Sequence, residues 1–396
     1  MKYLILNQNT DNYGDDIAAQ ALAHIIRSVD TKSQIRFLYG PRAWSGTVPV
    51  LGTEISHRVM GGMGGKTAYI DLARTYLKRK LGIKPKYKNV EFDALSNDLD
   101  WCDHVLVSPS GANIGIYQDW NALKVALQVA IHGKTLIFHL NTVGKSGNRA
   151  FDLLARFALS RSMVFVREAR CLEELKTWGL HSRFGPDSAF ALPAPQPTTY
   201  TQEIIGLVPT GLNWHPDHQS NKSLFIVDQL DDGFIKRFTA NENLVLHIIP
   251  HLYGHLDERT LLEKIRTALI EKGMPAERTV IADWVQSSDE YDIAIASCHV
   301  VITMRYHGVI LAAKNGVPFY AISYESKMNE ACRYTRMESY CVDVKNSSSD
   351  RLNVGLDRLL SEHGRISIQL RKTAEQLGKM THFPIYQAVF LGPEGG

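Results

Sequence analysis

The chain has 396 residues, of which 44% are apolar and 21% charged, and its formal net charge is +3. This length exceeds one ordinary hydrophobic core and predicts about two to three domains. The composition excludes a low-complexity chain, and no apolar run reaches the ~20 residues of a membrane span. So small a net charge gives no indication of nucleic acid as a partner.

The cysteines indicate a reducing compartment. There are five of them, an odd number, and they are widely spaced without a Cys-x-x-Cys pair. This pattern argues against a disulfide framework and against a zinc site. We therefore expect a cytoplasmic protein that binds no metal.

Strand and helix patterns alternate through the first half of the chain. Short apolar runs predict strands at residues 3–7, 35–39, 104–108, 135–140 and 163–167. Apolar residues at helical spacing predict helices at residues 15–29, 120–131, 149–159 and 168–178. The glycine-containing stretch 40–65 shows neither pattern, so we expect irregular structure there. Such alternation is typical of a parallel sheet with right-handed crossovers.

A segment between two of these patterns is rich in proline. Pro193, Pro195 and Pro197 lie close together and indicate a linker. After it the alternation restarts, with strands expected near residues 204–208, 244–249, 279–281, 300–304 and 319–323. We predict an N-terminal Rossmann-like domain at 1–191, a linker at 192–200, a C-terminal Rossmann-like domain at 201–378 and a tail at 379–396. Two such domains are expected to face each other across a cleft, as in GT-B-like glycosyltransferases, with C-terminal helices crossing back.

One segment, residues 58–88, is strongly basic and contains a single acid, Asp71. Its cations are Arg58, Lys66, Arg74, Lys78, Arg79, Lys80, Lys84, Lys86 and Lys88. Apolar side chains recur beside them at helical spacing, at Tyr69, Ile70, Ala73, Tyr76, Leu77 and Leu81. The stripe fits a helix packed on its own domain. The uncompensated charge fits an anionic membrane surface, and so a peripheral place at the inner face of the membrane.

The most informative motif is Met-Arg-Tyr-His-Gly at residues 304–308, followed by Tyr-Glu-Ser-Lys at 324–327. Both follow apolar strand patterns, and a helix pattern opens at Gly308, so Arg305, His307 and Lys327 are expected beyond the carboxyl ends of two successive strands. Open α/β sheets bind ligands there. Because residues two apart share a face in extended chain, Arg305 and His307 are expected to converge. Two cations and an imidazole suit a small dianion that must be protonated.

Other candidates also lie at predicted strand ends. Asn12, Gly14 and Asp15 form the turn into the first helix, either as a plain helix start or as a site of backbone N–H groups for a ligand. Further candidates are Ser110 and Asn113 in a loop of small residues, Arg167, Asp187 before the linker, and His251. An alternative for Arg305 is an ion pair with an acid across the hinge.

Taken together, these pieces resemble the polysaccharide pyruvyl transferase family over roughly residues 12–327. The resemblance rests on Asn-x-Gly-Asp at 12–15, Val-Arg-Glu at 166–168, Asp187, and Arg-x-His-Gly followed by Tyr-x-x-Lys. The last pair is the most specific. This chain departs from the family at residues 109–113, where Pro-Ser-Gly-Ala-Asn replaces a run of glycines, a change that bears on the acceptor.

The resemblance implies transfer of the enolpyruvyl unit of phosphoenolpyruvate onto two hydroxyls of one sugar, giving a pyruvate ketal in exopolysaccharide or cell-surface glycan biosynthesis. It implies no cofactor, since phosphoenolpyruvate is a co-substrate. The expected donor-binding residues are Arg305, Arg167, Lys327 and Tyr324. His307 is expected as the acid and His251 as a base for one hydroxyl.

The acceptor is expected to be a sugar, lipid-linked or polymeric. Its expected contacts are Asn12, Gly14, Asp15, Ser110, Asn113 and Asp187. Two rival functions stay open at this point. One is a glycosyltransferase that uses a nucleotide sugar, with Glu325 or Glu330 on the ribose. The other is a carbohydrate-binding protein without catalysis.

Overall fold

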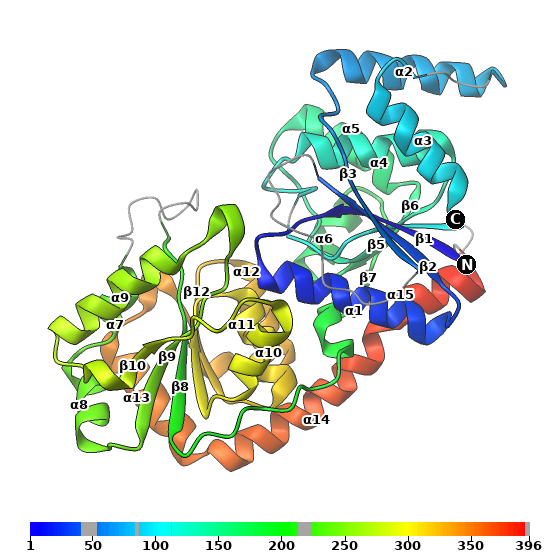
Figure 1. The fold of residues 1–396 in the computed structure, drawn as a ribbon. Coiled ribbons are helices and arrows are strands. Elements are labelled where there is room, and N and C mark those ends of the chain that lie inside the picture. Colours follow the sequence, from blue (N-terminus) through cyan, green and yellow to red (C-terminus); the bar gives the residue numbers. More distant parts are fainter. Residues whose placement is uncertain (41–53, 84–86, 112, 213–223, 393–396) are drawn as a thin grey trace. The chain divides into compact units, whose positions relative to one another are not determined.

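The computed structural model describes residues 1–40, 54–83, 87–111, 113–212 and 224–392, and these form two compact units (Figure 1). The first unit contains Met1–Thr10, Ala18–Ala191 and the chain from Lys379 onward. The second contains Leu192–Gly378 together with the short segment Asp11–Ile17. Of the predicted basic segment, Lys84 and Lys86 lie outside the described residues, as does the end of the predicted tail after residue 392.

The first unit is built on a sheet of seven parallel strands in the order β3-β2-β1-β4-β5-β6-β7. Its strands are β1 (Lys2–Gln8), β2 (Gln34–Tyr39), β3 (Ile55–Val59), β4 (His104–Val107), β5 (Leu136–Asn141), β6 (Ser162–Val166) and β7 (Arg183–Phe184). The strand order reverses between β1 and β4, where such sheets bind ligands. The irregular structure expected throughout 40–65 is wrong at β3, an edge strand whose partly exposed residues carry no apolar run.

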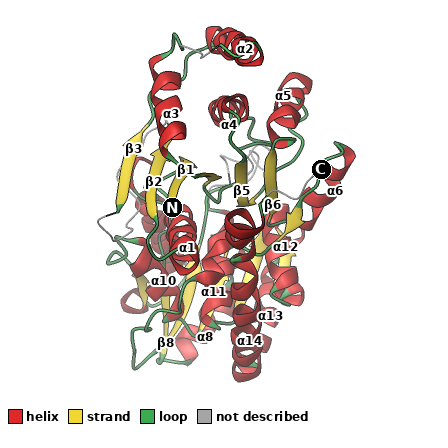
Figure 2. Ribbon diagram, turned by 90° about the vertical axis from the view of Figure 1, so that its right-hand side faces the viewer, coloured by secondary structure: helices red, strands yellow, loops and turns green. Residues whose placement is uncertain are grey.

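Helices cover both faces of this sheet, as Figure 2 shows. They are α1 (Tyr13–Val29), α2 (Lys66–Lys80), α3 (Val90–Trp101), α4 (Trp120–His132), α5 (Arg149–Leu159), α6 (Ala169–Thr177) and α15 (Phe383–Tyr386). Alternate residues of β1 enter different cores, because side chains alternate along a strand. Leu4 and Leu6 join the core under α2 to α6, whereas Tyr3 and Ile5 join the core under α1 and α15.

The second unit has a sheet of six parallel strands in the order β10-β9-β8-β11-β12-β13. Its strands are β8 (Glu203–Val208), β9 (Leu244–Ile248), β10 (Thr279–Ile281), β11 (Val300–Thr303), β12 (Phe319–Ser323) and β13 (Cys341–Asp343). Its helices are α7 (Phe225–Gln229), α8 (Asp232–Ala240), α9 (Arg259–Glu271), α10 (Ser288–Ala296), α11 (Tyr306–Asn315), α12 (Ser326–Tyr334), α13 (Ser349–Ser361) and α14 (His363–Thr381).

Both units therefore have the order of a Rossmann-type sheet, which reverses beside the first strand of each. The predicted α/β class with two parallel-sheet domains is confirmed. No helix among the described residues is long and apolar enough to cross a membrane.

Candidate functional site

The site is assembled at the junction of β11 and α11 in the second unit. Arg305 is the residue before α11, with extended backbone angles, and His307 is the second residue of the helix. The Thr303 side chain accepts a hydrogen bond from Arg305 N (3.0 Å) and donates one to Arg305 O (3.1 Å). A Cβ at Gly308 would lie 2.2 Å from the Thr303 hydroxyl, so glycine is required for this close turn.

The helix begins at Tyr306, two residues before the predicted start at Gly308. The argument that Arg305 and His307 share a face of extended chain is therefore wrong. Both residues nevertheless lie close enough to His251 to lower its pKa.

The segment Asp11–Ile17 lies against His307. A Cβ at Gly14 would be 2.0 Å from His307 Nδ1, so the imidazole occupies the space that a side chain at residue 14 would need. Backbone contacts hold the segment: Tyr13 N donates to His251 O (3.1 Å), and Asn12 forms an isolated bridge with Leu252. Asn12 Oδ1 accepts from the N–H groups of Gly14 (2.9 Å) and Asp15 (3.3 Å), so it caps the start of α1.

His251 lies at the centre of this cluster, three residues after β9. It is buried, its Nδ1 is 3.0 Å from the Tyr291 hydroxyl, and its ring centroid is 6.3 Å from that of His307. Burial lowers the pKa of His251 well below its usual range, and the nearby Arg305, His307 and Lys327 lower it further. His251 is therefore neutral at neutral pH.

Glu258 is a member of the site that sequence reasoning missed. Its carboxylate accepts from His251 N (2.7 Å) and Leu252 N (3.1 Å) and forms a buried ion pair with Arg305. Arg305 Nε also donates to Pro209 O (3.2 Å). The acid that pairs with Arg305 thus belongs to the same unit, and the alternative of a pair across the hinge is wrong. An acid just before α9 gives no sequence signal beyond that of an ordinary helix start.

Lys327 has the same position after β12 that His307 has after β11. It is the second residue of α12, which begins directly after Glu325 and shortly after β12. Its ammonium group pairs with Glu325 (2.9 Å) and lies 5.9 Å from the centroid of the Tyr306 ring. Since β11 and β12 pair in parallel, His307 and Lys327 start neighbouring helices. Tyr324 is buried and interacts electrostatically with Arg305.

A second missed residue is Asp16, whose buried carboxylate accepts from the Tyr253 hydroxyl (2.6 Å). Burial raises the pKa of Asp16 to about 8, although the hydrogen bond from Tyr253 lowers it. The ring of Tyr13 stacks on Tyr253 at 4.7 Å and on Tyr291 at 5.7 Å. These rings join the Asp16 region to His251.

In the first unit, the predicted residues Arg167 and Asp187 form a buried ion pair with 2.7 Å between Nη1 and Oδ2. Arg167 also donates to Ser110 O (3.0 Å) and to the Thr142 hydroxyl (3.3 Å). His139 lies near Asp187 and is fully buried, and burial lowers its pKa to about 3. Arg167 therefore holds together the strand ends of its own domain.

A small pocket of the first unit is lined by the predicted residues Ser110 and Asn113 together with Asn7, Asn141 and Thr142. Asn141 Nδ2 donates to Ser108 O (2.7 Å), whereas its Oδ1 is buried without a hydrogen-bond partner among the described residues. The rest of the lining is largely apolar, and the volume of about 10 Å³ is that of a single water-sized group.

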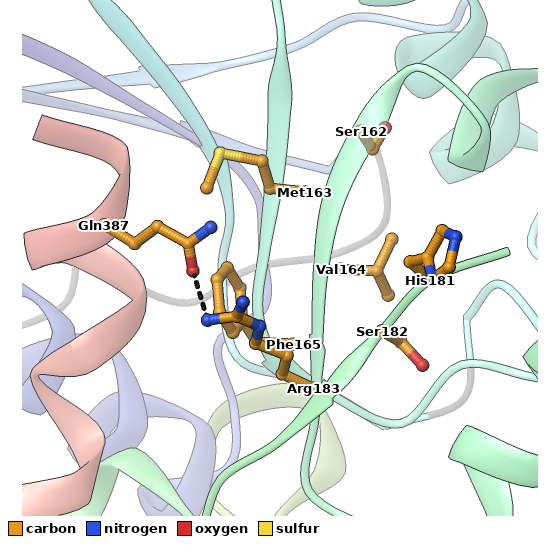
Figure 3. A pocket seen from close by; sticks show the side chains of 8 residues that line it. All are labelled: Ser162, Met163, Val164, Phe165, His181, Ser182, Arg183 and Gln387. Atoms are coloured by element: carbon orange, nitrogen blue, oxygen red, sulfur yellow. Dashed lines mark hydrogen bonds between the residues drawn. The ribbon is translucent and has the colours of Figure 1, made fainter. Parts of the chain in front are cut away.

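A different pocket of the first unit, drawn in Figure 3, contains none of the predicted residues. The Arg183 side chain points toward Gln387, and its Nη1 donates a hydrogen bond to Gln387 Oε1 (3.2 Å). The Arg183 guanidinium also lies over the Phe383 ring. The residues lining it are Ser162, Met163, Val164, Phe165, His181, Ser182, Arg183 and Gln387. The guanidinium of Arg183 is the only permanent charge among the lining residues, and it already interacts with Gln387 and Phe383. Among the described residues, no group of three His, Cys, Asp or Glu side chains is arranged to hold a metal ion.

Comparisons with known proteins give a family and a fold. A family model described as polysaccharide pyruvyl transferase matches residues 12–326. No protein of curated function matches the chain.

Solved structures resemble the whole chain at low identity. Anabaena Alr3699/HepE, solved with UDP and glucose, is 13% identical with a TM-score of 0.60, and the match covers 98% of this chain and 99% of that one. The UDP-GlcNAc 2-epimerase of Neisseria meningitidis, solved with UDP-GlcNAc, is 8% identical with a TM-score of 0.59, and the match covers 98% and 100%. These similarities show the fold, which is of the expected GT-B type.

Proposed function

Because the chain belongs to the polysaccharide pyruvyl transferase family, we propose that it transfers the enolpyruvyl unit of phosphoenolpyruvate to two hydroxyls of one sugar. The product is a cyclic pyruvate ketal, and inorganic phosphate is released. The observation that carries this proposal is the cluster of His307, Arg305 and Lys327 around neutral His251. Such a cluster provides positive charge, a proton donor and a proton acceptor within one domain.

The donor is assigned to the cations of the second unit. Phosphoenolpyruvate has a carboxylate and a phosphate, which suit Lys327 and the guanidinium of Arg305. Both cations already have carboxylate partners, Glu325 and Glu258, so the donor competes with or joins these pairs. Arg167, a further predicted donor residue, is engaged by Asp187 and Ser110, so we assign it to holding the Ser110 loop.

His307 is proposed to protonate C3 of the enol, which makes C2 electrophilic. One sugar hydroxyl then adds to C2 and loses its proton. The C–O bond to phosphate breaks, and the second hydroxyl closes the ring as its proton leaves with the phosphate. Cations that stabilise the donor phosphate also stabilise the departing phosphate.

His251 is proposed to accept the proton of the first hydroxyl. Its neutral state suits this role, but its lowered pKa makes it a weak base in the free protein. A bound dianion offsets the effect of Arg305, His307 and Lys327 and raises the pKa of His251. Donor binding thus activates the base at the same time as it supplies the electrophile.

The acceptor is proposed to be a sugar of an exopolysaccharide or cell-surface glycan. Ser110 and Asn113 are the candidate contacts, since their hydroxyl and amide groups can form hydrogen bonds with a sugar. Gly14 contributes by leaving room for the His307 ring, and Asn12 by capping the turn that carries Gly14 and Asp15.

The test is release of phosphate from phosphoenolpyruvate in the presence of a set of galactosides, glucosides and mannosaminides. We expect His307→Gln to lower turnover by about 10²–10⁴, the usual worth of a positioned acid. His299→Gln, in the same domain but stacked on His363, is the matched control and should retain activity. Thermal stabilisation by a nucleotide sugar and not by phosphoenolpyruvate would instead identify a glycosyltransferase.

A further inference from the structure

Helix α2 has two different apolar faces. One face is buried in its own domain through Ala68 and Leu72, with Tyr69 against Trp120 and Tyr76 against Phe157. The opposite face exposes Ile70 (52%), Leu77 (61%) and, just past the helix, Leu81 (74%). Because their spacing is seven and four residues, these three side chains lie along one line of the helix. The predicted apolar stripe is thus divided, and half of it is left uncovered.

Cations are interleaved with these exposed side chains. Arg74 and Lys78 stand four and eight residues after Ile70 and are exposed along one side of this line. The one acid of α2, Asp71, is buried and accepts hydrogen bonds from the backbone N–H groups of Lys88 and Asn89. Among the described residues, no acidic side chain pairs with Arg74 or Lys78.

Two cations near this face do have partners, whereas the cations of the outer face have no acidic partner among the described residues. Arg58 pairs with Asp98 and Glu91, and Arg79 is directed inward to His132. Ile83 and Val90, in the chain after α2, are also exposed, and α2 lies at the outer edge of its unit in both views (Figure 1, Figure 2).

We propose that the outer face of α2, made by Ile70, Arg74, Leu77, Lys78 and Leu81, binds the surface of an anionic lipid bilayer. The aliphatic side chains would enter the boundary between headgroups and acyl chains, and the cations would contact the anionic headgroups. The pattern favours a bilayer over other partners. An apolar protein groove would leave the cations without counter-charge, and a soluble polyanion would leave the aliphatic side chains in water. This binding is independent of the proposed transfer chemistry.

The experiment is co-sedimentation of the full chain with vesicles of phosphatidylcholine alone or mixed with phosphatidylglycerol. We expect binding to the mixed vesicles only, weakened by salt. The variants Leu77→Ser and Lys78→Glu should each lower the partition coefficient about tenfold. The matched controls are Ile368→Ser and Lys372→Glu on α14, where Ile368 is 69% exposed beside a cation one turn away. These controls should bind like the unchanged chain.

Three outcomes would overturn the proposal: no sedimentation with mixed vesicles, equal sedimentation with both kinds, or equal loss in the α14 variants. Binding to heparin without binding to vesicles would also overturn it and would indicate a soluble acidic partner. Since no donor or acceptor is present, failure of this experiment leaves the proposed transferase activity untouched. Conversely, if the protein binds mixed vesicles but releases no phosphate from phosphoenolpyruvate, the proposal that α2 binds a bilayer is still supported.

Discussion

Arg167 and Arg305 both lie just beyond the carboxyl end of a strand, after β6 in the first unit and after β11 in the second, yet their surroundings differ. Each forms a buried pair with a carboxylate, Arg167 with Asp187 and Arg305 with Glu258. The Arg167 network consists of groups with fixed charge, and its histidine, His139, has a pKa lowered to about 3 by burial. The Arg305 network contains His251 and His307, whose environment a bound anion would change. Two arginines that both lie just beyond a strand can therefore have different surroundings, and only the Arg305 network has two histidines next to the cation.

The largest effect is expected from breaking the pair in the first domain. Arg167→Met leaves the fully buried Asp187 carboxylate without its partner and should lower the free energy of unfolding by about 3–5 kcal/mol. Urea denaturation measures this change. The double variant Arg167→Met, Asp187→Leu should recover much of the loss, because an apolar pair replaces the ion pair. A loss below about 1 kcal/mol, typical of an exposed pair, would contradict a structural role for Arg167.

A smaller loss is expected from Glu258→Gln. The amide can still accept from His251 N, but the charge beside Arg305 is removed, so the free energy of unfolding should fall by about 3 kcal/mol. Phosphoenolpyruvate should then stabilise this variant more than it stabilises the unchanged chain, since the ligand replaces the missing negative charge.

Thermal unfolding with and without phosphoenolpyruvate measures the difference. Glu263→Gln on the exposed side of α9 is the control and should behave like the unchanged chain. Equal stabilisation of all three proteins would show that Arg305 does not contact the donor.

The sequence predicted both sheets because buried parallel strands are continuous apolar runs. It missed β3, β7 and β13, which are edge or terminal strands with little apolar content. It also predicted the start of α11 two residues late, at Gly308, since Tyr306 carries no cap signal.

Long-range contacts account for the remaining misses. Glu258 reaches Arg305 across 47 residues of sequence, and Gly14 reaches His307 across nearly the whole chain. No local pattern encodes either contact. The motif at 304–308 could be predicted because its residues are neighbours in sequence, whereas the residues that surround it could not.

Gly14→Ala should affect turnover more than stability. The new methyl group would overlap the His307 ring and force the imidazole to move. A displacement of about 1 Å is worth roughly 10²-fold in rate, while the strain should cost about 2 kcal/mol. Phosphate release measures the effect on turnover, and urea denaturation measures the effect on stability. Gly364→Ala, where a methyl group meets open space on α14, is the control. Full activity of the Gly14→Ala protein would contradict the proposed role of His307 as the acid.

The last comparison concerns Asp16, a buried carboxyl that, unlike Asp187, is hydrogen-bonded to a tyrosine instead of paired with an arginine. Its pKa is about 8 in the folded protein, above the usual 3.8, so between these values the folded state binds more protons than the unfolded state. Its contribution to stability is full below the lower value and is lost as pH rises through the higher one, by about 1 kcal/mol per pH unit.

Asp16→Asn lacks this titration, so its stability relative to the unchanged chain should increase as pH rises from about 5 to 8. Urea denaturation at several pH values gives the slope directly. Asp93→Asn, which removes one exposed carboxyl on α3, controls for the loss of a surface charge. If the Asp16→Asn difference decreased with pH, Asp16 would be ionised in the folded protein. The two carboxyls would then belong to networks of the same kind, and the contrast between the domains would rest on the histidines alone.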